Sequence, residues 1–339
     1  MEMKTEKLSK LIVILGPTAS GKTELAIKLA LRLGSGQAKK KFGINGVEIV
    51  SADSRQIYRE MNIGTAKPTK KEIKIVPYYL IDFLNSNQEF NVALYKKMAL
   101  RIIRDIHRRG KIPFLVGGTG LYIKAIVDNI EFPTVPAQKK LREKLEKKTV
   151  KELFKIYKKL DPLGARFIEK KNKRRLIRAI EVCKVTKKPF WTQRKGGEPI
   201  FDVLQIGMKL SKNELKKRII KRVEKMFKSG LEKEAKKLAK KCGWDIPPMQ
   251  TIGYQEWKNY FEKKIDINEV KRKIVLHTIQ FTKRQMTWFT HQSFVHPPQI
   301  SKKFGRAGQN LGGFKRDKRI HWVKNYKEAE KFIKEFLIK

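Results

Sequence analysis

The stretch Gly16-Pro17-Thr18-Ala19-Ser20-Gly21-Lys22-Thr23 matches the pattern G-x-x-x-x-G-K-[ST], the phosphate-binding loop. Residues 11–15 (LIVIL) before it predict a buried strand, and residues 24–33 (ELAIKLALRL) after it have helical apolar spacing. A strand, a glycine-rich loop and a helix N-terminus in this order bind anions, because backbone N–H groups and the helix dipole face the phosphate. We expect Lys22 to reach the terminal phosphate and the Thr23 hydroxyl to bind Mg²⁺. The loop predicts a phosphate-containing substrate but does not specify which one.

Basic residues dominate the charge of the chain. The 339 residues include 79 Lys and Arg against 33 Asp and Glu, which gives a formal net charge of +46. Such a field attracts polyanions and speeds their encounter with the protein. It favours an RNA or DNA partner, and a lysine-biased surface that serves solubility is the alternative.

The sequence carries no signal for secretion or for a membrane. The N-terminus lacks the apolar region of a signal peptide, and no apolar run approaches the length of a transmembrane helix. The two cysteines, Cys183 and Cys242, lie far apart and form no metal-binding spacing. We therefore expect a cytoplasmic protein with no membrane partner, disulfide framework or zinc site. We also expect it to be a monomer.

Strands and helices alternate in the first third of the chain. Residues 47–52 (VEIVSA) and 112–116 (IPFLV) predict two more buried strands. The first ends on Asp53-Ser54-Arg55-Gln56 and the second on Gly117-Gly118-Thr119-Gly120. Repeated strand-loop-helix units predict an α/β fold with a P-loop NTPase-like parallel sheet flanked by helices. Functional groups gather at strand carboxyl ends in such sheets, so Asp53 should share an edge with the phosphate loop.

The alternating pattern stops near Pro133. From Pro136 to Thr186 the sequence predicts helices and no strand, which indicates an all-helical domain inserted into the sheet domain. The expected parts are the first part of the core at 1–132, the inserted domain at 133–199, the second part of the core at 200–290, a basic Gly/Pro-rich insert at 291–319, and a C-terminal strand and helix at 320–339. The basic segment 34–46 is expected to be a loop. Helices expected after residue 200 cover about 212–230, 251–261 and 269–290.

Several blocks of this sequence resemble one family. The blocks are GPTASGKTELA (16–26), VSADSRQIYREMNIGTAKP (50–68), LVGGTGLYIKA (115–125), RRLIRAIEV (174–182), IGYQE (252–256) and KRQMTWF (283–289). In this order they resemble the tRNA dimethylallyltransferases of bacterial type, across most of residues 10–290. The resemblance implies that N6 of the adenine immediately 3′ of the anticodon attacks C1 of dimethylallyl diphosphate, and that pyrophosphate leaves. Segments 39–46 and 291–319 depart from the usual pattern of the family.

The resemblance implies that the phosphate loop binds the pyrophosphate of the prenyl donor. Negative charge develops on this leaving group, and Lys22, Thr23 with Mg²⁺ and the loop N–H groups would stabilise it. Arg218 and Arg222 lie four residues apart on one predicted helix face, so they are candidates to close over the pyrophosphate. A solvated or RNA-facing basic stripe is the alternative for this pair.

Asp53 matches the catalytic aspartate of the family. An aromatic amine is a poor nucleophile, and a carboxylate that takes its proton would speed the attack by roughly 10²–10⁴-fold. A carboxylate after a strand also suits a Mg²⁺ ligand, and the residues alone leave both roles open. The resemblance favours the base.

The target adenine must leave its stack to reach the allyl carbon. We expect it to enter a channel bounded by residues 53–56 and Thr119. Ser54, Arg55 and Gln56 are candidates to read neighbouring bases, and Tyr122 either lines the channel or packs in the core. The anticodon stem-loop should contact the inserted domain, where the candidates are Arg142, Arg174, Arg175, Leu176, Ile177 and Arg178.

Two other functions are compatible with a phosphate loop. An ATP-dependent small-molecule or nucleotide kinase would bind ATP there, but the strand at 112–116 ends in Gly-Gly rather than Asp. A non-catalytic RNA-binding protein would explain the charge, but an intact Lys22-Thr23 pair and Asp53 argue against a vestigial site.

Overall fold

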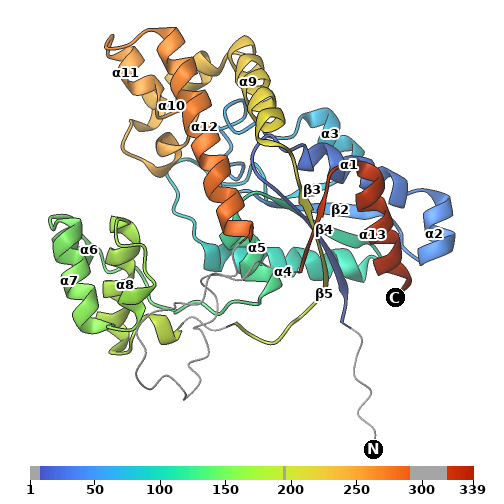
Figure 1. Ribbon diagram of the computed structural model, residues 1–339, viewed down its shortest axis with the longest axis horizontal. Coiled ribbons are helices and arrows are strands. Elements are labelled where there is room, and N and C mark those ends of the chain that lie inside the picture. Colours follow the sequence, from blue (N-terminus) through green and yellow to red (C-terminus); the bar gives the residue numbers. More distant parts are fainter. Residues whose placement is uncertain (1–7, 194–195, 291–318) are drawn as a thin grey trace, which may run out of the picture. The chain divides into compact units, whose positions relative to one another are not determined.

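The structure is a computed structural model that describes residues 8–193, 196–290 and 319–339 (Figure 1). The described residues divide into two compact units. Unit 1 comprises 8–127, 200–290 and 319–339, and unit 2 comprises 128–193 and 196–199. Unit 2 therefore interrupts unit 1 in sequence and begins at Asp128, where 133 was predicted. The predicted basic insert at 291–319 lies outside the described residues, except for Arg319.

A parallel sheet forms the centre of unit 1. Its six strands are β1 (Lys10–Leu15), β2 (Val47–Ala52), β3 (Tyr78–Tyr79), β4 (Ile112–Gly117), β5 (Asp202–Met208) and β6 (Ile320–Val323). The order across the sheet is β3-β2-β4-β1-β5-β6, and every neighbouring pair is parallel. The predicted parallel α/β sheet is confirmed, with the two-residue edge strand β3 as an addition.

Helices cover both faces of the sheet (Figure 1). Ile12 and Ile14 of β1 pack into one apolar cluster with residues of α1 (Lys22–Leu33) and α13 (Tyr326–Ile338). Leu11, Val13 and Leu15 pack into the other with residues of α4 (Val92–Arg108) and α5 (Gly120–Val127). Successive side chains of a strand point to opposite faces, so a strand buried on both sides is apolar throughout. This explains why the continuous LIVIL run could be recognised as a central strand.

A third apolar cluster lies away from the sheet. It is built on fully buried Trp257 and Tyr254 and on apolar residues of α9 (Lys212–Lys228), α10 (Leu231–Cys242) and α12 (Ile267–Thr290). The loop after β2 adds Ile57, Tyr58 and Met61 to the same cluster. This packing fixes α9 and α12 against the loops at the carboxyl ends of the strands.

The helices differ from the sequence prediction in several places. The expected loop at 34–46 contains α2 (Gly36–Phe42), which Ser35 caps by accepting from the Ala38 N–H. Helix α10 was not predicted, because lysines fill its exposed face and leave a short apolar stripe. The helix expected at 251–261 is a 3-10 turn (Pro247–Gln250) followed by α11 (Trp257–Phe261), since Gly253 has a left-handed φ of 98° between them. The short helix α3 (Lys70–Ile75) precedes β3.

The described part of unit 2 is helical, apart from one isolated bridge between Ile130 and Gly196. Its elements are α6 (Lys139–Glu146), α7 (Val150–Leu160), a 3-10 turn (Gly164–Arg166), α8 (Lys173–Thr186) and a 3-10 turn (Trp191–Gln193). Buried residues of α7 and α8 form most of its apolar core. Buried Asp161 accepts hydrogen bonds from the Tyr157 hydroxyl and from two backbone N–H groups, which fixes the segments around α7.

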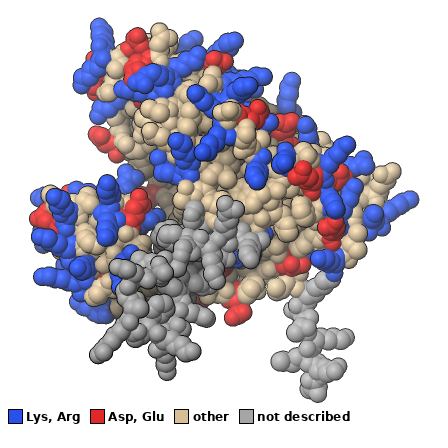
Figure 2. Space-filling view, in the orientation of Figure 1, with Lys and Arg blue, Asp and Glu red and all other residues tan. Residues whose placement is uncertain are grey.

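The surface is strongly basic. On the face shown in Figure 2, Lys and Arg side chains are more frequent than Asp and Glu over α9 to α12 of unit 1 and over unit 2. None of the helices in the described ranges is long and apolar enough to cross a membrane. The surface thus fits a polyanionic partner.

Candidate active site

The phosphate loop connects β1 to α1 and leaves backbone donors for an anion. Gly21 has a left-handed φ of 89°, and no side chain caps the helix after it. The first N–H groups of α1 therefore have no capping acceptor, as an anion-binding helix N-terminus requires. The Ser20 hydroxyl is buried and has no hydrogen-bond partner within the described residues. The loop has the form that the sequence predicts, and α1 begins at Lys22 instead of Glu24.

Lys22 lies in a region of concentrated charge. Its ammonium donates to the Pro17 carbonyl over 3.2 Å. Burial lowers the pKa of Lys22 from 10.5 to about 8, the nearby Asp53 carboxylate opposes this change, and the Arg222 charge reinforces it. Two cations thus face a single carboxylate, and a bound diphosphate would supply the missing negative charge.

Asp53 follows β2 and has one carboxylate oxygen to spare. Its Oδ1 accepts from the backbone N–H groups of Arg55 at 2.8 Å and Gln56 at 3.4 Å. These bonds orient the side chain. Its Oδ2 makes no hydrogen bond within the described part of the chain. This oxygen is available to a substrate amine.

The turn after β4 braces the loop after β2. Thr119 donates its N–H to the Ala52 carbonyl at 3.0 Å, and its hydroxyl accepts from the Ser54 N–H at 3.0 Å. The ends of strands β2 and β4 approach so closely that a Cβ at Gly117 would lie 2.2 Å from the Ala52 oxygen. Glycine is required there by this contact, and the contact holds Asp53 and Thr119 at one edge of the sheet.

Gln285 of α12 connects the phosphate loop to the β4–α5 turn. Its Oε1 accepts from the Thr18 N–H at 2.8 Å, and its Nε2 donates to the Gly118 carbonyl at 2.8 Å. Its side chain is nearly buried. Sequence reasoning gave this residue no role. The available signal was a set of polar residues, Thr278, Thr282 and Gln285, on the buried stripe of a long helix.

The two predicted arginines of α9 differ in environment. Arg222 is half-buried and donates to the Thr65 carbonyl at 3.2 Å, and burial lowers its pKa although Asp53 opposes the shift. Arg218 is exposed, pairs with Glu214 at 2.7 Å, and donates to the Ser20 carbonyl of the phosphate loop at 3.3 Å. Both approach the loop, and of the two only Arg222 lines the adjoining cavity.

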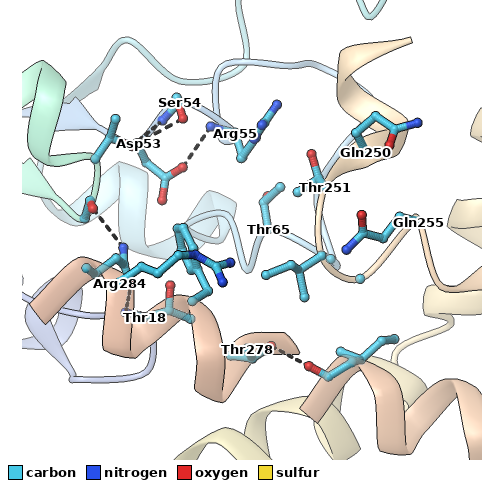
Figure 3. A pocket seen from close by; sticks show the side chains of 18 of the residues that line it. Thr18, Asp53, Ser54, Arg55, Thr65, Gln250, Thr251, Gln255, Thr278 and Arg284 are labelled. Atoms are coloured by element: carbon cyan, nitrogen blue, oxygen red, sulfur yellow. Dashed lines mark hydrogen bonds between the residues drawn. The ribbon is translucent and has the colours of Figure 1, made fainter. Parts of the chain in front are cut away.

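A cavity of about 500 Å³ adjoins the phosphate loop (Figure 3). Its polar lining includes Thr18, Asp53, Ser54, Arg55, Thr65, Thr119, Arg222, Gln250, Thr251, Gln255, Arg284 and Gln285. Its apolar lining includes Leu121, Val223, Met226, Ile252, Ile274, Phe281 and Trp288. The volume lies in the usual range for a small-molecule pocket. The mixed lining suits a ligand with a charged end and an apolar end.

Two predicted channel residues lie elsewhere. Gln56 donates its amide to the Thr65 and Ala66 carbonyls, each at 3.3 Å, and does not line the cavity. Tyr122 is buried and stacks on Tyr95 with ring centroids 3.8 Å apart. Of the two possibilities left open for Tyr122, core packing is therefore the one observed. Gln56 supports the loop that contains Thr65, and its contact with a base stays a prediction.

In unit 2 the predicted RNA-binding residues fall into two groups. Leu176 and Ile177 are buried in its apolar core, which corrects the expectation that these side chains contact RNA. Arg142 and Arg178 both bind Glu181, at 2.8 and 2.6 Å. Burial alone would raise the pKa of Glu181, but these hydrogen bonds hold it below its usual range.

Arg174 and Arg175 remain as outward-facing candidates. Arg174 is exposed, and Arg175 is half-exposed with Glu169 at 3.4 Å. A pair at that distance and exposure is weak, so it can exchange its carboxylate for a phosphate at little cost.

The comparisons with known proteins agree with this geometry. A family model described as IPP transferase matches residues 56–292, and one described as isopentenyl transferase matches residues 9–87. The chain belongs to the IPP transferase family. The resemblance drawn from the sequence blocks is thereby confirmed.

Relatives within the family cover nearly the whole chain. The tRNA dimethylallyltransferase of Gloeothece citriformis is 43% identical over 84% of this chain and 90% of its own length. That of Crocosphaera subtropica is 42% identical over 89% and 98%. The crystal structure of the full-length tRNA isopentenylpyrophosphate transferase of Bacillus halodurans shares 31% identity, covers 97% of this chain and 96% of its own, and gives a TM-score of 0.63.

A second solved structure extends the comparison beyond bacteria. It shows a eukaryotic dimethylallyltransferase acting on tRNA, with 26% identity, a TM-score of 0.69, and coverage of 84% of this chain and 70% of its own. The family's sheet and its phosphate loop are therefore the scaffold on which the cavity described above is built.

Proposed function

We propose that this protein transfers the dimethylallyl group of dimethylallyl diphosphate to N6 of the adenine immediately 3′ of the anticodon in tRNA. The observation that carries the proposal is one cavity in which phosphate-loop residue Thr18 and the Asp53 carboxylate both face an apolar wall. A diphosphate at the loop and a prenyl group on that wall would bring the allylic carbon near the carboxylate. The names of the relatives support tRNA and the dimethylallyl group, and the phosphate loop supports a diphosphate as the leaving group.

The leaving group would be bound by the phosphate loop. The uncapped N–H groups of α1, the Lys22 ammonium and the Arg222 guanidinium provide preorganised positive charge. Charge on the pyrophosphate grows as the C–O bond breaks, so these groups act more strongly in the transition state than on the bound donor. Arg218, which already contacts the loop through the Ser20 carbonyl, would add a solvent-exposed contact.

The nucleophile would be activated by Asp53. As the N6–C1 bond forms and the C1–O bond breaks, the amine must lose a proton, and the spare Oδ2 is the acceptor that the site offers. The hydrogen bonds to Oδ1 keep the carboxylate oriented throughout. Ser54, Arg55 and Thr119, which line the same cavity, would contact the adenine and its neighbours.

Magnesium fits the donor set as a partner of the substrate. The described residues contain no group of three His, Cys, Asp or Glu side chains that could hold a metal ion. Mg²⁺ usually keeps several waters and binds through one or two protein oxygens plus substrate phosphates. Thr23, half-buried at the start of α1, would supply such an oxygen. The ion would neutralise diphosphate charge.

The proposal is tested by transfer from labelled dimethylallyl diphosphate, with Mg²⁺, to unmodified tRNA that carries the adenine 3′ of the anticodon. Label in this tRNA is expected, and none in a matched tRNA with guanine at that position. ATP turnover without transfer would favour the kinase alternative, and tRNA binding without either reaction would favour the RNA-binding alternative. Neither alternative finds support in the family to which the chain belongs.

We also propose that the enzyme acts as a monomer in the cytoplasm. The described residues of one chain already bring the phosphate loop, Asp53 and an apolar wall to the same cavity. Sedimentation velocity should give one species near 39.6 kDa. A dimer at working concentration would contradict this part of the proposal.

Replacing Gln285 by Leu should raise KM for the prenyl donor about tenfold. The variant leaves the buried Thr18 N–H and Gly118 carbonyl unpaired, at a cost of roughly 1–3 kcal/mol each, and the phosphate loop should shift to rehydrate them. Steady-state kinetics at varied donor concentration measure this change. Gln280→Leu, at an exposed position of the same helix, is the control. An unchanged KM in Gln285→Leu would show that donor binding does not need the two hydrogen bonds of Gln285.

Replacing Arg175 by Ala should weaken tRNA binding and lower the slope of log affinity against log salt by about 1, since one phosphate contact is lost. Arg174→Ala should behave alike. Arg108→Ala is the control, because this exposed arginine ends α4 at the sheet edge opposite the cavity. Filter binding measures the slope of log affinity against log salt between about 50 and 200 mM salt, the range in which counterion release changes affinity strongly. An effect limited to one tRNA sequence would indicate base reading instead.

A further inference from the structure

Glu234 of α10 does not line the cavity. It binds two loops, residues 62–65 and 250–254, and these loops form one wall of the cavity. Its carboxylate accepts hydrogen bonds from four donors on two other segments. The donors are the backbone N–H groups of Asn62 (3.1 Å), Ile63 (2.9 Å) and Gly64 (3.0 Å), and the hydroxyl of Tyr254 (2.7 Å). No other carboxylate in the described ranges accepts from three consecutive backbone N–H groups.

The three N–H groups form a concave anion site that the side chain fills. Successive N–H groups that converge in this way bind negative charge, so the loop shape depends on the carboxylate. Gly64 packs directly on Tyr254, and a Cβ on Gly64 would lie 2.5 Å from that ring. Burial, together with the charge of Glu234, raises the pKa of Tyr254, which keeps its hydroxyl a donor.

The loop held by Glu234 contacts Arg222, the half-buried arginine of the site. Gly64 and Thr65 line the cavity, and the Thr65 carbonyl accepts from Arg222 at 3.2 Å and from the Gln56 amide at 3.3 Å. Movement of this carbonyl would therefore move the guanidinium. Arg222 forms no ion pair within 4 Å of a carboxylate in the described part of the chain, so its hydrogen bond to the Thr65 carbonyl is its main anchor.

The second loop held by Glu234 continues the same wall. Tyr254 directly follows residues 250–253, which line the cavity. Figure 3 shows Gln250 and Thr251 on the side of the cavity away from Asp53. In this view Thr65 lies between that side and Asp53. A single carboxylate thus ties both loops to α10.

We propose that Glu234 is a positioning residue for the diphosphate site, which sets the Thr65 carbonyl and through it the guanidinium of Arg222. The proposal rests on the transferase function proposed above, because that function assigns Arg222 to the diphosphate. A carboxylate is needed because its two oxygens accept from all four donors. Glutamine has one acceptor oxygen and an NH₂ group that would face N–H groups.

The test uses inorganic pyrophosphate as the probe, with binding measured by calorimetry on the full chain. Glu234→Gln should bind pyrophosphate about tenfold more weakly, and Arg222→Gln should lose at least as much. The double variant should bind no more weakly than Arg222→Gln alone, because Glu234 acts through Arg222. Glu234→Asp, which keeps the charge, should recover part of the affinity. Additive losses in the double variant would overturn the proposal.

Kinetics supply a second readout that a general loss of stability would not give. Glu234→Gln should raise KM for the donor and leave KM for tRNA unchanged. Glu232→Gln is the matched control, because that carboxylate binds the Tyr260 hydroxyl, which does not line the cavity. Parallel losses for donor and tRNA, in step with a lower Tm, would overturn the proposal.

If Glu234→Gln does not fold, Tyr254→Phe removes one donor and keeps the charge. It should weaken pyrophosphate binding about two- to threefold in the presence of Arg222, and not at all in Arg222→Gln. Equal losses in both backgrounds would overturn the proposal. The comparison of single and double variants measures pyrophosphate binding and does not depend on prenyl transfer. Absence of transfer would therefore refute the proposed function, and the binding result could still be interpreted.

Discussion

Asp53→Asn should lower the single-turnover rate of dimethylallyl transfer by roughly 10²–10⁴-fold, the usual contribution of a general base. Asparagine keeps an oxygen that can accept from the Arg55 and Gln56 N–H groups, so the loop should hold its shape. The spare oxygen becomes an amide NH₂, which cannot take a proton from N6. The rate is measured with saturating donor and enzyme in excess over tRNA.

Binding separates the two roles open to Asp53. If Asp53 acts as the base, the variants Asp53→Asn and Asp53→Ala should bind tRNA with nearly the affinity of the wild-type protein. Collapse of tRNA binding in both would make Asp53 mainly a recognition residue. Asp105→Asn, on the surface of α4, is the control for loss of one negative charge.

Lys22→Met should lower kcat by about 10²–10³-fold, comparable to the loss of one preorganised donor at a site of developing charge. Methionine keeps the length and apolar stem of the side chain, so the phosphate loop should fold as before. KM for the donor should also rise, because in the proposed function the ammonium would contact the diphosphate before the reaction as well. A change of less than threefold in kcat would assign the stabilisation to Arg222 and the loop N–H groups.

The same lysine predicts a pH dependence. Burial lowers the pKa of Lys22 to about 8 in the free protein, so the side chain is charged below this pH and loses its proton above it. Since kcat/KM reports the free enzyme, kcat/KM for the donor should fall as pH rises through about 8. A bound diphosphate raises the pKa of Lys22, so kcat should stay level over the same range. The fall in kcat/KM near this pH should be absent in Lys22→Met.

The parts predicted well from the sequence are those that local signals determine. The phosphate loop is contiguous, and the strands that carry Asp53 and Thr119 are short apolar runs that parallel sheets bury on both faces. The carboxyl ends of these strands meet at one edge by topology alone. These local signals are enough to predict that the phosphate loop, Asp53 and Thr119 lie together.

The parts predicted poorly depend on contacts between distant segments. Gln285 and Thr18 are 267 residues apart, and nothing in either local sequence indicates that they meet. Glu234 looks like one of many charged residues on a helix whose apolar stripe is short. Leu176 is predicted to contact RNA because it lies in a family-like block, and Gln56 because its amide suits an adenine edge, but neither signal says which way the side chain points.

The order of the strands has a consequence for synthesis on the ribosome. Strand β1 lies between β4 and β5, and β5, α9 and α12 all follow unit 2 in the chain. At 5–20 residues per second, the 267 residues between Thr18 and Gln285 take about 10 to 50 seconds to translate. Over this interval the nascent phosphate loop first lacks both Arg222 and Gln285, and it still lacks Gln285 after Arg222 has been synthesised. Under the proposed function, binding of the diphosphate donor is thus among the last properties that the growing polypeptide acquires, and prematurely terminated chains should not bind this donor.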